Sequence, residues 1–228
     1  MNPRICASIR PQTISEAQDL IKKAEQSQAD LIEIRLDHLE QTKNLTALTK
    51  NTTLPLIATN KLDTLTTKNP NIEIEKQQTL LNAAKAGFQY VDIDFFDPTR
   101  DKTITKLKQL GTNPIVSYHK FDGILGVSAL GEILDKQIAV GAAVCKIVLT
   151  AKHIEDNLSV LSFIAFASVR TKLVCFCMGE AGKTSRLLAP AFGAYFTFAA
   201  LQQGNETAPG QMTIADMRLA YKLLGLMP

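Results

Sequence analysis

The sequence predicts a single (β/α)8 barrel over residues 1–228, and three observations support this fold class. Eight short apolar runs follow one another along the chain, and helix-length segments lie between most of them, as in parallel sheets covered by helices. The chain has 228 residues, of which 46% are hydrophobic, so it can bury one sizeable core. No linker or internal repeat marks a second domain. Eight units in one short domain favour a closed barrel over the alternative, an open parallel sheet.

The strands are expected at the apolar runs, because each is short and rich in β-branched or aromatic residues. In chain order they are RICASI, LIEIRL, LPLIAT, YVDIDF, PIVSYH, AVCKIVL, KLVCFCM and YFTFAAL. Helices are expected at 15–28, 74–86, 103–110, 129–140, 154–169 and 214–224. Ser15, followed by acidic Glu16 and Asp19, suits a helix start. Gly87 stands where a helix would end before the next strand.

Alternation within the strands predicts which side chains enter the barrel. Successive residues of a strand point to opposite faces, and the helices outside require an apolar outer face. The polar faces are therefore expected to point inward, and they carry Glu33, Arg35, Asp37, Asp92, Asp94, Ser117, His119 and Lys146. A purely structural barrel interior is filled by branched apolar residues. Charged groups from several strands thus predict an active site at their carboxyl ends.

Lys146 is the most informative of these residues. It lies within AAVCKIVLT, which is otherwise almost wholly apolar, and a buried lysine is rare unless it is paired or used. Burial should remove hydration, lower the pKa of the amine and make it a nucleophile toward a carbonyl carbon. The alternative is a solvated lysine on a short edge strand, which the apolar neighbours disfavour.

His119 shares the predicted interior with Lys146 and is suited to general acid–base catalysis, since a histidine titrates near neutral pH. Glu33 could orient it. The alternative for His119 is a hydrogen-bonded core histidine, and His38 and His153 are interpreted as surface groups. Asp92 and Asp94 are the candidate metal ligands, but a hard metal needs more oxygen ligands than this pattern supplies. The prediction is therefore no metal.

Two later segments carry candidate binding residues. MGEAGKTSRL resembles a phosphate-binding loop, but that motif needs glycine five positions before Gly182, where Cys177 stands. Arg186 offers a planar fork suited to a carboxylate. ETAPGQ, residues 206–211, follows the last expected strand, where barrel loops often close over a substrate.

Composition excludes several other functions. The net charge is +3 with no basic run, which argues against nucleic acid and membrane-surface binding. No apolar stretch is long enough for a transmembrane helix or a signal peptide. The four cysteines lie in strand-like runs and are expected to be small apolar residues in a reducing cytoplasm.

These stretches together resemble type I 3-dehydroquinate dehydratases. The resemblance runs in order through EIRLDHL, VDIDF, SYHKF, CKIVLTAKHIED, MGEAGKTSRLLAPAFGAYFTFAAL and APGQ, and covers most of the chain. It implies a (β/α)8 barrel, usually dimeric, that dehydrates 3-dehydroquinate to 3-dehydroshikimate in the shikimate pathway without a metal or organic cofactor.

The resemblance also implies a role for each matching residue. Lys146 matches the imine-forming lysine, His119 the general acid/base, and Glu33 a carboxylate that orients this histidine. The substrate-binding positions are matched by Arg35, Arg186, Thr207, Gln211 and Lys61. Thr207 replaces the serine that is usual in the family. After the third strand the family has Thr-x-Arg and a Glu-Gly-Gly loop, whereas this chain reads ATNKLDTLT.

Two other functions compete with this prediction. A class I aldolase would use the same lysine to cleave a carbon–carbon bond, often in a phosphorylated substrate, whereas Arg186 and APGQ favour a carboxylate. A barrel that only binds a ligand would explain the altered Lys61 region. It would not explain a buried amine beside a histidine.

Overall fold

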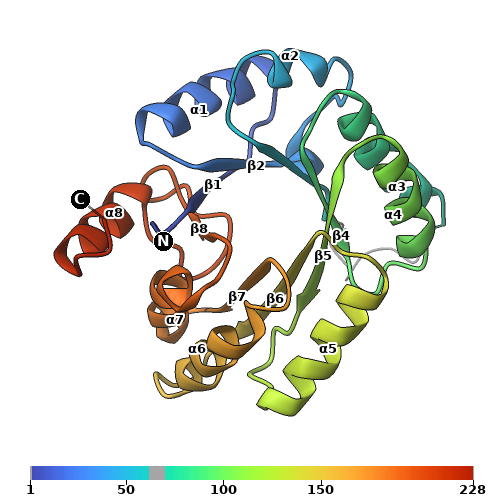
Figure 1. Ribbon diagram of the computed structural model, residues 1–228. Coiled ribbons are helices and arrows are strands. Elements are labelled where there is room, and N and C mark those ends of the chain that lie inside the picture. Colours follow the sequence, from blue (N-terminus) through green and yellow to red (C-terminus); the bar gives the residue numbers. More distant parts are fainter. Residues whose placement is uncertain (1, 62–69, 228) are drawn as a thin grey trace.

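The computed structural model describes residues 2–61 and 70–227, and its parallel strands form a nearly closed barrel with helices outside (Figure 1). The predicted fold class is confirmed, and all eight predicted strands are present. They are β1 (Ile5–Ile9), β2 (Leu31–Arg35), β3 (Leu56–Thr59), β4 (Tyr90–Asp94), β5 (Asn113–His119), β6 (Val144–Thr150), β7 (Leu173–Met178) and β8 (Thr197–Ala199).

The helices also follow the predicted order. They are α1 (Ile14–Gln26), α2 (Thr46–Thr49), α3 (Pro70–Lys85), α4 (Arg100–Gln109), α5 (Val127–Ala139), α6 (Asp156–Ala167), α7 (Lys183–Leu188) and α8 (Ile214–Leu223). Short 3-10 turns occur at η1 (Leu36–His38), η2 (Glu180–Gly182) and η3 (Ala189–Phe192). The sequence did not predict α2 or α7, which are too short to show an apolar period. The cap of α1 is Thr13, whose side chain accepts from the Glu16 amide. Gly87 has a φ of +98°, as a helix stop requires.

The strand order explains how the barrel closes. Neighbours run from β7 through β6, β5, β4, β3, β2 and β1 to β8, so the chain returns to its first strand. At the remaining seam, between β7 and β8, the Tyr195 amide donates to the Leu173 carbonyl at 2.7 Å.

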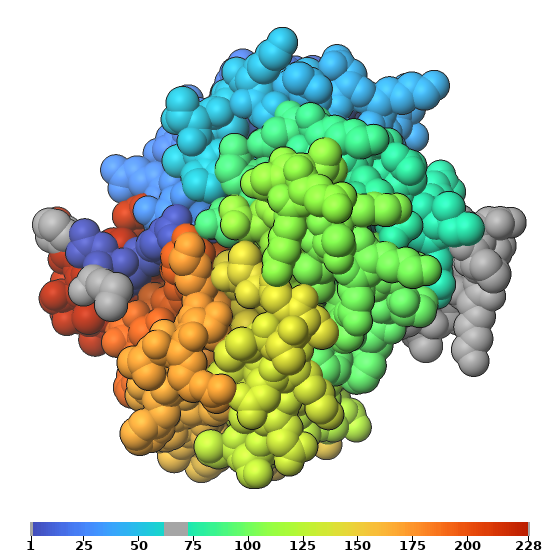
Figure 2. Space-filling model, turned by 45° about the vertical axis from the view of Figure 1, so that its right-hand side comes forward, coloured from blue at the N-terminus to red at the C-terminus, as the bar shows by residue number. Residues whose placement is uncertain are grey.

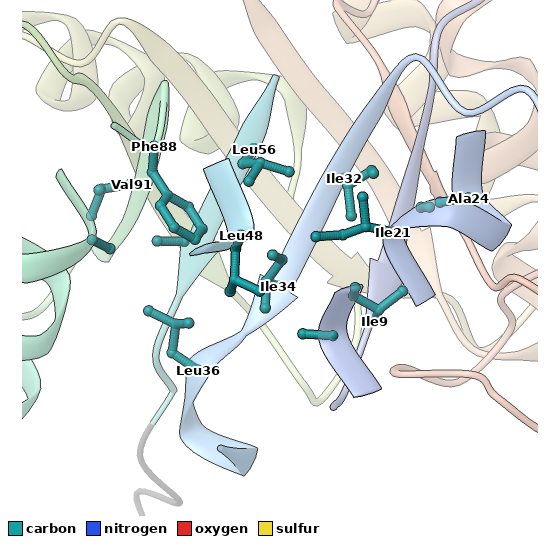
Figure 3. Close-up of a cluster of buried hydrophobic side chains, with 14 of the residues drawn as sticks. Ile9, Ile21, Ala24, Ile32, Ile34, Leu36, Leu48, Leu56, Phe88 and Val91 are labelled. Carbon is teal, nitrogen blue, oxygen red and sulfur yellow. The ribbon is translucent and has the colours of Figure 1, made fainter. Parts of the chain in front are cut away.

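An apolar layer between strands and helices forms much of the core (Figure 3). Ile21 and Ala24 of α1 lie against Ile9 and Ile32 of the first two strands, and all four are almost fully buried. On the face shown in Figure 2, the segments from the middle of the chain, coloured green to yellow, lie next to one another. The outward strand faces therefore hold the helices and leave the inward faces for polar groups.

Register places these polar groups next to one another inside the barrel. Thr59 pairs with Asp92 across β3 and β4, and Ser117 pairs with Lys146 across β5 and β6. Paired residues of adjacent strands point to the same face.

The two remaining structural expectations concern cysteines and membranes. All four cysteines are buried and free. Among residues 2–61 and 70–227, no helix combines the length and hydropathy that crossing a membrane requires.

Candidate active site

A cavity of about 670 Å³ lies at the carboxyl ends of the strands. The eight catalytic and binding residues predicted from the sequence all line it: Glu33, Arg35, Lys61, His119, Lys146, Arg186, Thr207 and Gln211. They come from several strands and from loops distant in sequence. The barrel therefore gathers the predicted residues around one space.

Lys146 projects into this cavity from the middle of β6, and its residue is only 5% exposed. Its Nζ donates to Asp92 Oδ2 at 2.8 Å and lies 3.6 Å from Glu33 Oε1. The ammonium group also lies 4.4 Å from the centre of the Phe198 ring, a favourable position for a cation over an aromatic face.

The predicted lowering of the Lys146 pKa is wrong. Burial by itself does lower the pKa, but the negative charges of Asp92 and Glu33, together with the hydrogen bond to Asp92, raise it above its usual 10.5. Opposite charges within a few ångströms favour the charged form of an amine. In this structure Lys146 is therefore an ammonium ion at neutral pH.

Glu33 of β2 is fixed by two hydroxyl groups. Ser8 donates to Glu33 Oε2 at 2.5 Å, and Thr59 donates to Oε1 at 2.8 Å. Thr207 in turn donates to Ser8 at 2.7 Å. The described hydrogen bonds of Glu33 thus connect it to the loop after β8 rather than to His119, and its charge lies beside Lys146.

His119 ends β5 at the wall of the cavity. Its ring stacks on Phe121 with the planes 11° apart and the centroids 6.1 Å apart. Burial is the main cause that holds the pKa of the imidazole well below 6.5, and the cations of Lys61 and Lys146 act in the same direction. His119 is therefore neutral at pH 7. His38 and His153 are exposed, as predicted.

Arg186 lies in α7, and the residue is 1% exposed. Its guanidinium carbon lies 4.3 Å from the centre of the Phe176 ring, and Nη2 donates to the Pro209 carbonyl at 3.2 Å. Its Nε has no hydrogen-bond partner among the described residues. Burial lowers the pKa of Arg186 to about 10, which leaves it charged and able to receive an anion from the cavity.

The loop after β8 closes one side of the cavity. Thr207 and Gln211 bond to each other, with Gln211 Nε2 donating to Thr207 Oγ1 at 2.9 Å. The Pro209 carbonyl accepts from the Gly179 amide at 3.2 Å. Gly210 has a φ of +74°, and a Cβ there would lie 2.1 Å from the Gly179 carbonyl oxygen. The loop therefore needs glycine at this point.

Arg35 and Lys61 line the cavity at the ends of β2 and β3. Arg35 forms a bidentate pair with Asp37, at 3.0 and 2.6 Å. Lys61 donates to Asp92 Oδ1 at 3.0 Å and to Ser117 at 2.7 Å. The following segment, where the Glu-Gly-Gly loop is absent from the sequence, falls on 62–69 and lies outside the described residues.

Sequence reasoning missed the role of Asp92 as the shared partner of two lysines. The alternation had placed it inside the barrel, but only the fold shows which side chains reach it. It also missed Ser8 and Thr59, which are small hydroxyl residues without a recognisable motif, and it gave no role to Ser117. Within 2–61 and 70–227, no group of three or more His, Cys, Asp or Glu side chains is arranged to hold a metal ion.

Comparisons with known proteins identify the family of this chain. The model of the family described as type I 3-dehydroquinase matches residues 5–228. A 3-dehydroquinate dehydratase from Dehalococcoides mccartyi is 32% identical over 220 residues, 96% of this chain and 95% of the relative. One from Methanothermobacter thermautotrophicus is 32% identical over 231 residues, 100% of this chain and 99% of the relative. The crystal structure of 3-dehydroquinate dehydratase from Geobacillus kaustophilus superposes with a TM-score of 0.88 at 24% identity, covering 99% of this chain and 92% of that one.

Proposed function

Because this chain belongs to the type I 3-dehydroquinase family of hydro-lyases, we propose that it dehydrates 3-dehydroquinate to 3-dehydroshikimate through an imine on Lys146. The chain acts as one catalytic domain, with a small-molecule substrate and a place in the shikimate pathway. The observation that carries the proposal is the buried amine of Lys146, which shares one cavity with a neutral imidazole and a buried guanidinium group.

The first step is attack of the Lys146 amine on the ring ketone. The ammonium group must lose a proton before it attacks, and His119 is a neutral base in the same cavity. Loss of water from the carbinolamine gives an iminium ion. Asp92 and Glu33 stabilise this cation by the same attraction that raises the pKa of the free lysine.

The second step is elimination across the adjacent carbon–carbon bond. The iminium ion withdraws electrons and acidifies the neighbouring carbon–hydrogen bond, from which His119 removes a proton. The electron pair then expels the β-hydroxyl group, which leaves as water with the proton that His119 carries. Hydrolysis of the imine releases the product and regenerates Lys146, so one difficult elimination is divided into easier steps.

Residues of the cavity walls orient the substrate. Arg186 binds the substrate carboxylate through its planar fork. Thr207 and Gln211 bind hydroxyl groups from the loop after β8, and Arg35 contacts the substrate from the end of β2. Such positioning can lower the barrier by about 7–11 kcal/mol in favourable cases.

The test is reductive trapping of the imine. The protein is mixed with 3-dehydroquinate and borohydride, its intact mass is measured, and the modified peptide is mapped. We expect one adduct, on Lys146 and not on Lys61, in the wild type and in His119→Ala. We expect none in Lys146→Ala, a folded protein without turnover. Formation of dehydroshikimate is followed by its absorbance.

Three outcomes would count against the proposal. Turnover by Lys146→Ala at a tenth of the wild-type rate would refute the imine role. Trapping with an aldol substrate but not with 3-dehydroquinate would indicate an aldolase. Stabilisation by the substrate without turnover or adduct would indicate a protein that only binds.

We propose further that the chain forms a homodimer in a reducing cytoplasm, as the resemblance implies. The four buried free cysteines suit that compartment. An exposed apolar stripe along α6 suits a second copy of the chain, since a helix apolar on more than one face needs a partner. It consists of Leu158 and Phe166 of α6 and the flanking residues Ile154 and Val169. Light scattering should give a dimer that Phe166→Glu dissociates and Leu223→Glu, on α8, does not.

A further inference from the structure

Asp92 lies between two lysines at the wall of the cavity. Its Oδ2 accepts from Lys146 at 2.8 Å, while its Oδ1 accepts from Lys61 at 3.0 Å and from Ser117 at 2.5 Å. The Asp92 side chain is 0% exposed, against 7% for that of Lys146 and 24% for that of Lys61. One buried carboxylate therefore neutralises part of each of two positive charges.

The hydrogen bonds of Lys61 are directed toward the protein. An ammonium group has three donors, and Lys61 uses two of them on Asp92 and Ser117. In addition, Asp94 Oδ2 lies 3.8 Å from the Nζ of Lys61. By contrast, the Nε of Arg186 has no hydrogen-bond partner among the described residues.

We propose that Lys61 is a positioning residue that fixes Asp92 and Ser117 beside His119. This role differs from the substrate contact that the sequence suggested. It deepens the proposed function, on which its catalytic consequence rests. Ser117 and His119 point to the same face of β5, two residues apart, so the Lys61 charge lies near the imidazole.

Several charged groups surround His119, and their sum decides its protonation. They are Glu33 and Arg35 of β2, Lys61 after β3, Asp92 and Asp94 of β4, Lys146 of β6 and Arg186 of α7. After burial, the Lys61 cation is the largest influence that lowers the pKa of His119, while Asp92 raises it. Loss of Lys61 removes a lowering charge and also leaves Asp92 less neutralised. Both changes raise the pKa of His119.

The test is an NMR titration of the imidazole in the ligand-free protein, which does not depend on activity. His119→Asn identifies the signal among those of the three histidines. Lys61→Met should move the His119 pKa upward, because it removes the positive charge that, after burial, lowers this pKa most. Lys61→Arg should leave it low.

Two further variants make the titration decisive. Lys61→Gln keeps a donor for Asp92 without the charge, so it should raise the His119 pKa as Lys61→Met does even if the methionine variant folds poorly. Lys76→Met removes another cavity-lining lysine, which is paired with Asp97 at 3.5 Å, and should have little effect. An unchanged His119 pKa in Lys61→Gln, or an equal shift in Lys76→Met, would overturn the proposal.

The pH dependence of kcat/KM gives the second measurement. In Lys61→Met and Lys61→Gln the acid limb should move to higher pH with the His119 titration, and Lys61→Arg should restore it. A higher KM with an unshifted limb and an unshifted titration would show that Lys61 contacts substrate instead. If the wild type does not dehydrate 3-dehydroquinate, the proposed function fails, whereas the titration still decides the role of Lys61.

Discussion

Replacing Asp92 by asparagine tests the electrostatic balance on which the cavity depends. The substitution keeps the size and one acceptor oxygen but removes a charge that is 2.8 Å from Lys146 and 3.0 Å from Lys61. Removing one partner of a buried ion pair typically costs about 3–5 kcal/mol, because the remaining charge is buried without compensation. Glu33 stays 3.6 Å from Lys146, so we expect about 3 kcal/mol at pH 7.

The pH dependence of this loss identifies its cause. In the wild type the pKa of Lys146 is raised above 10.5, so its stabilising contribution is fully present from pH 7 to 10 and is lost only as pH rises through the raised value. Without Asp92, burial lowers the pKa, and below 10.5 the unfolded chain then binds more protons than the folded one. The free energy of unfolding of Asp92→Asn should therefore rise with pH up to about 10.5.

Urea denaturation at pH 7, 8, 9 and 10 measures both effects. The control is Asp94→Asn on the same strand, where the carboxylate is 34% exposed and lies 3.8 Å from Lys61. An exposed pair of this kind is worth about 0–1 kcal/mol. A loss below about 1 kcal/mol in Asp92→Asn, or a deficit that stays constant from pH 7 to 10, would refute the reasoning.

Three other substitutions follow from single features of the site. Because the folded-state pKa of His119 lies below the unfolded value of 6.5, wild-type stability should fall as pH drops below about 6.5; thermal unfolding should show a smaller fall in His119→Asn. Arg186→Met should fold with equal or greater stability, since it removes a buried charge with one weak hydrogen bond, while KM rises about 30-fold or more, the equivalent of about 2 kcal/mol. Gly210→Ala should lower kcat/KM because its Cβ meets the Gly179 carbonyl, whereas Gly204→Ala, also at positive φ with nothing within 4 Å, should not; equal effects would contradict the loop argument.

The barrel was predictable because each of its strands has a recognisable local sequence pattern. Runs such as LIEIRL and AVCKIVL have the length, the apolar content and the alternation of strands that face helices on one side. The same alternation fixed the inward direction of Glu33, His119 and Lys146. Since parallel strands of a barrel end together, residues far apart in sequence could be assigned to one cavity from the sequence alone.

The charge state of Lys146 was not predictable in the same way. Alternation assigns a face to each residue, but not its height along the barrel or its distance from a side chain on another strand. The lysine and Asp92 are separated by 54 residues, and their contact depends on the register of β4, β5 and β6. Without that register, burial was the only influence on the Lys146 pKa that the sequence revealed. Burial lowers this pKa, whereas the nearby carboxylates raise it by more.

The raised pKa of Lys146 suits an enzyme that forms an imine, because the carboxylates act both on the free lysine and on the protonated imine. Asp92 and Glu33 make the free amine scarcer, which slows attack on the ketone. They also stabilise the protonated imine, whose positive charge occupies the same nitrogen and makes the neighbouring carbon–hydrogen bond acidic. A neutral His119 partly offsets the first effect, because its unprotonated imidazole can accept the ammonium proton, although the low pKa of the imidazole makes this transfer uphill. In the proposed mechanism the carboxylates therefore favour the intermediate from which water is eliminated, and the imidazole speeds its formation and then removes the proton that starts the elimination.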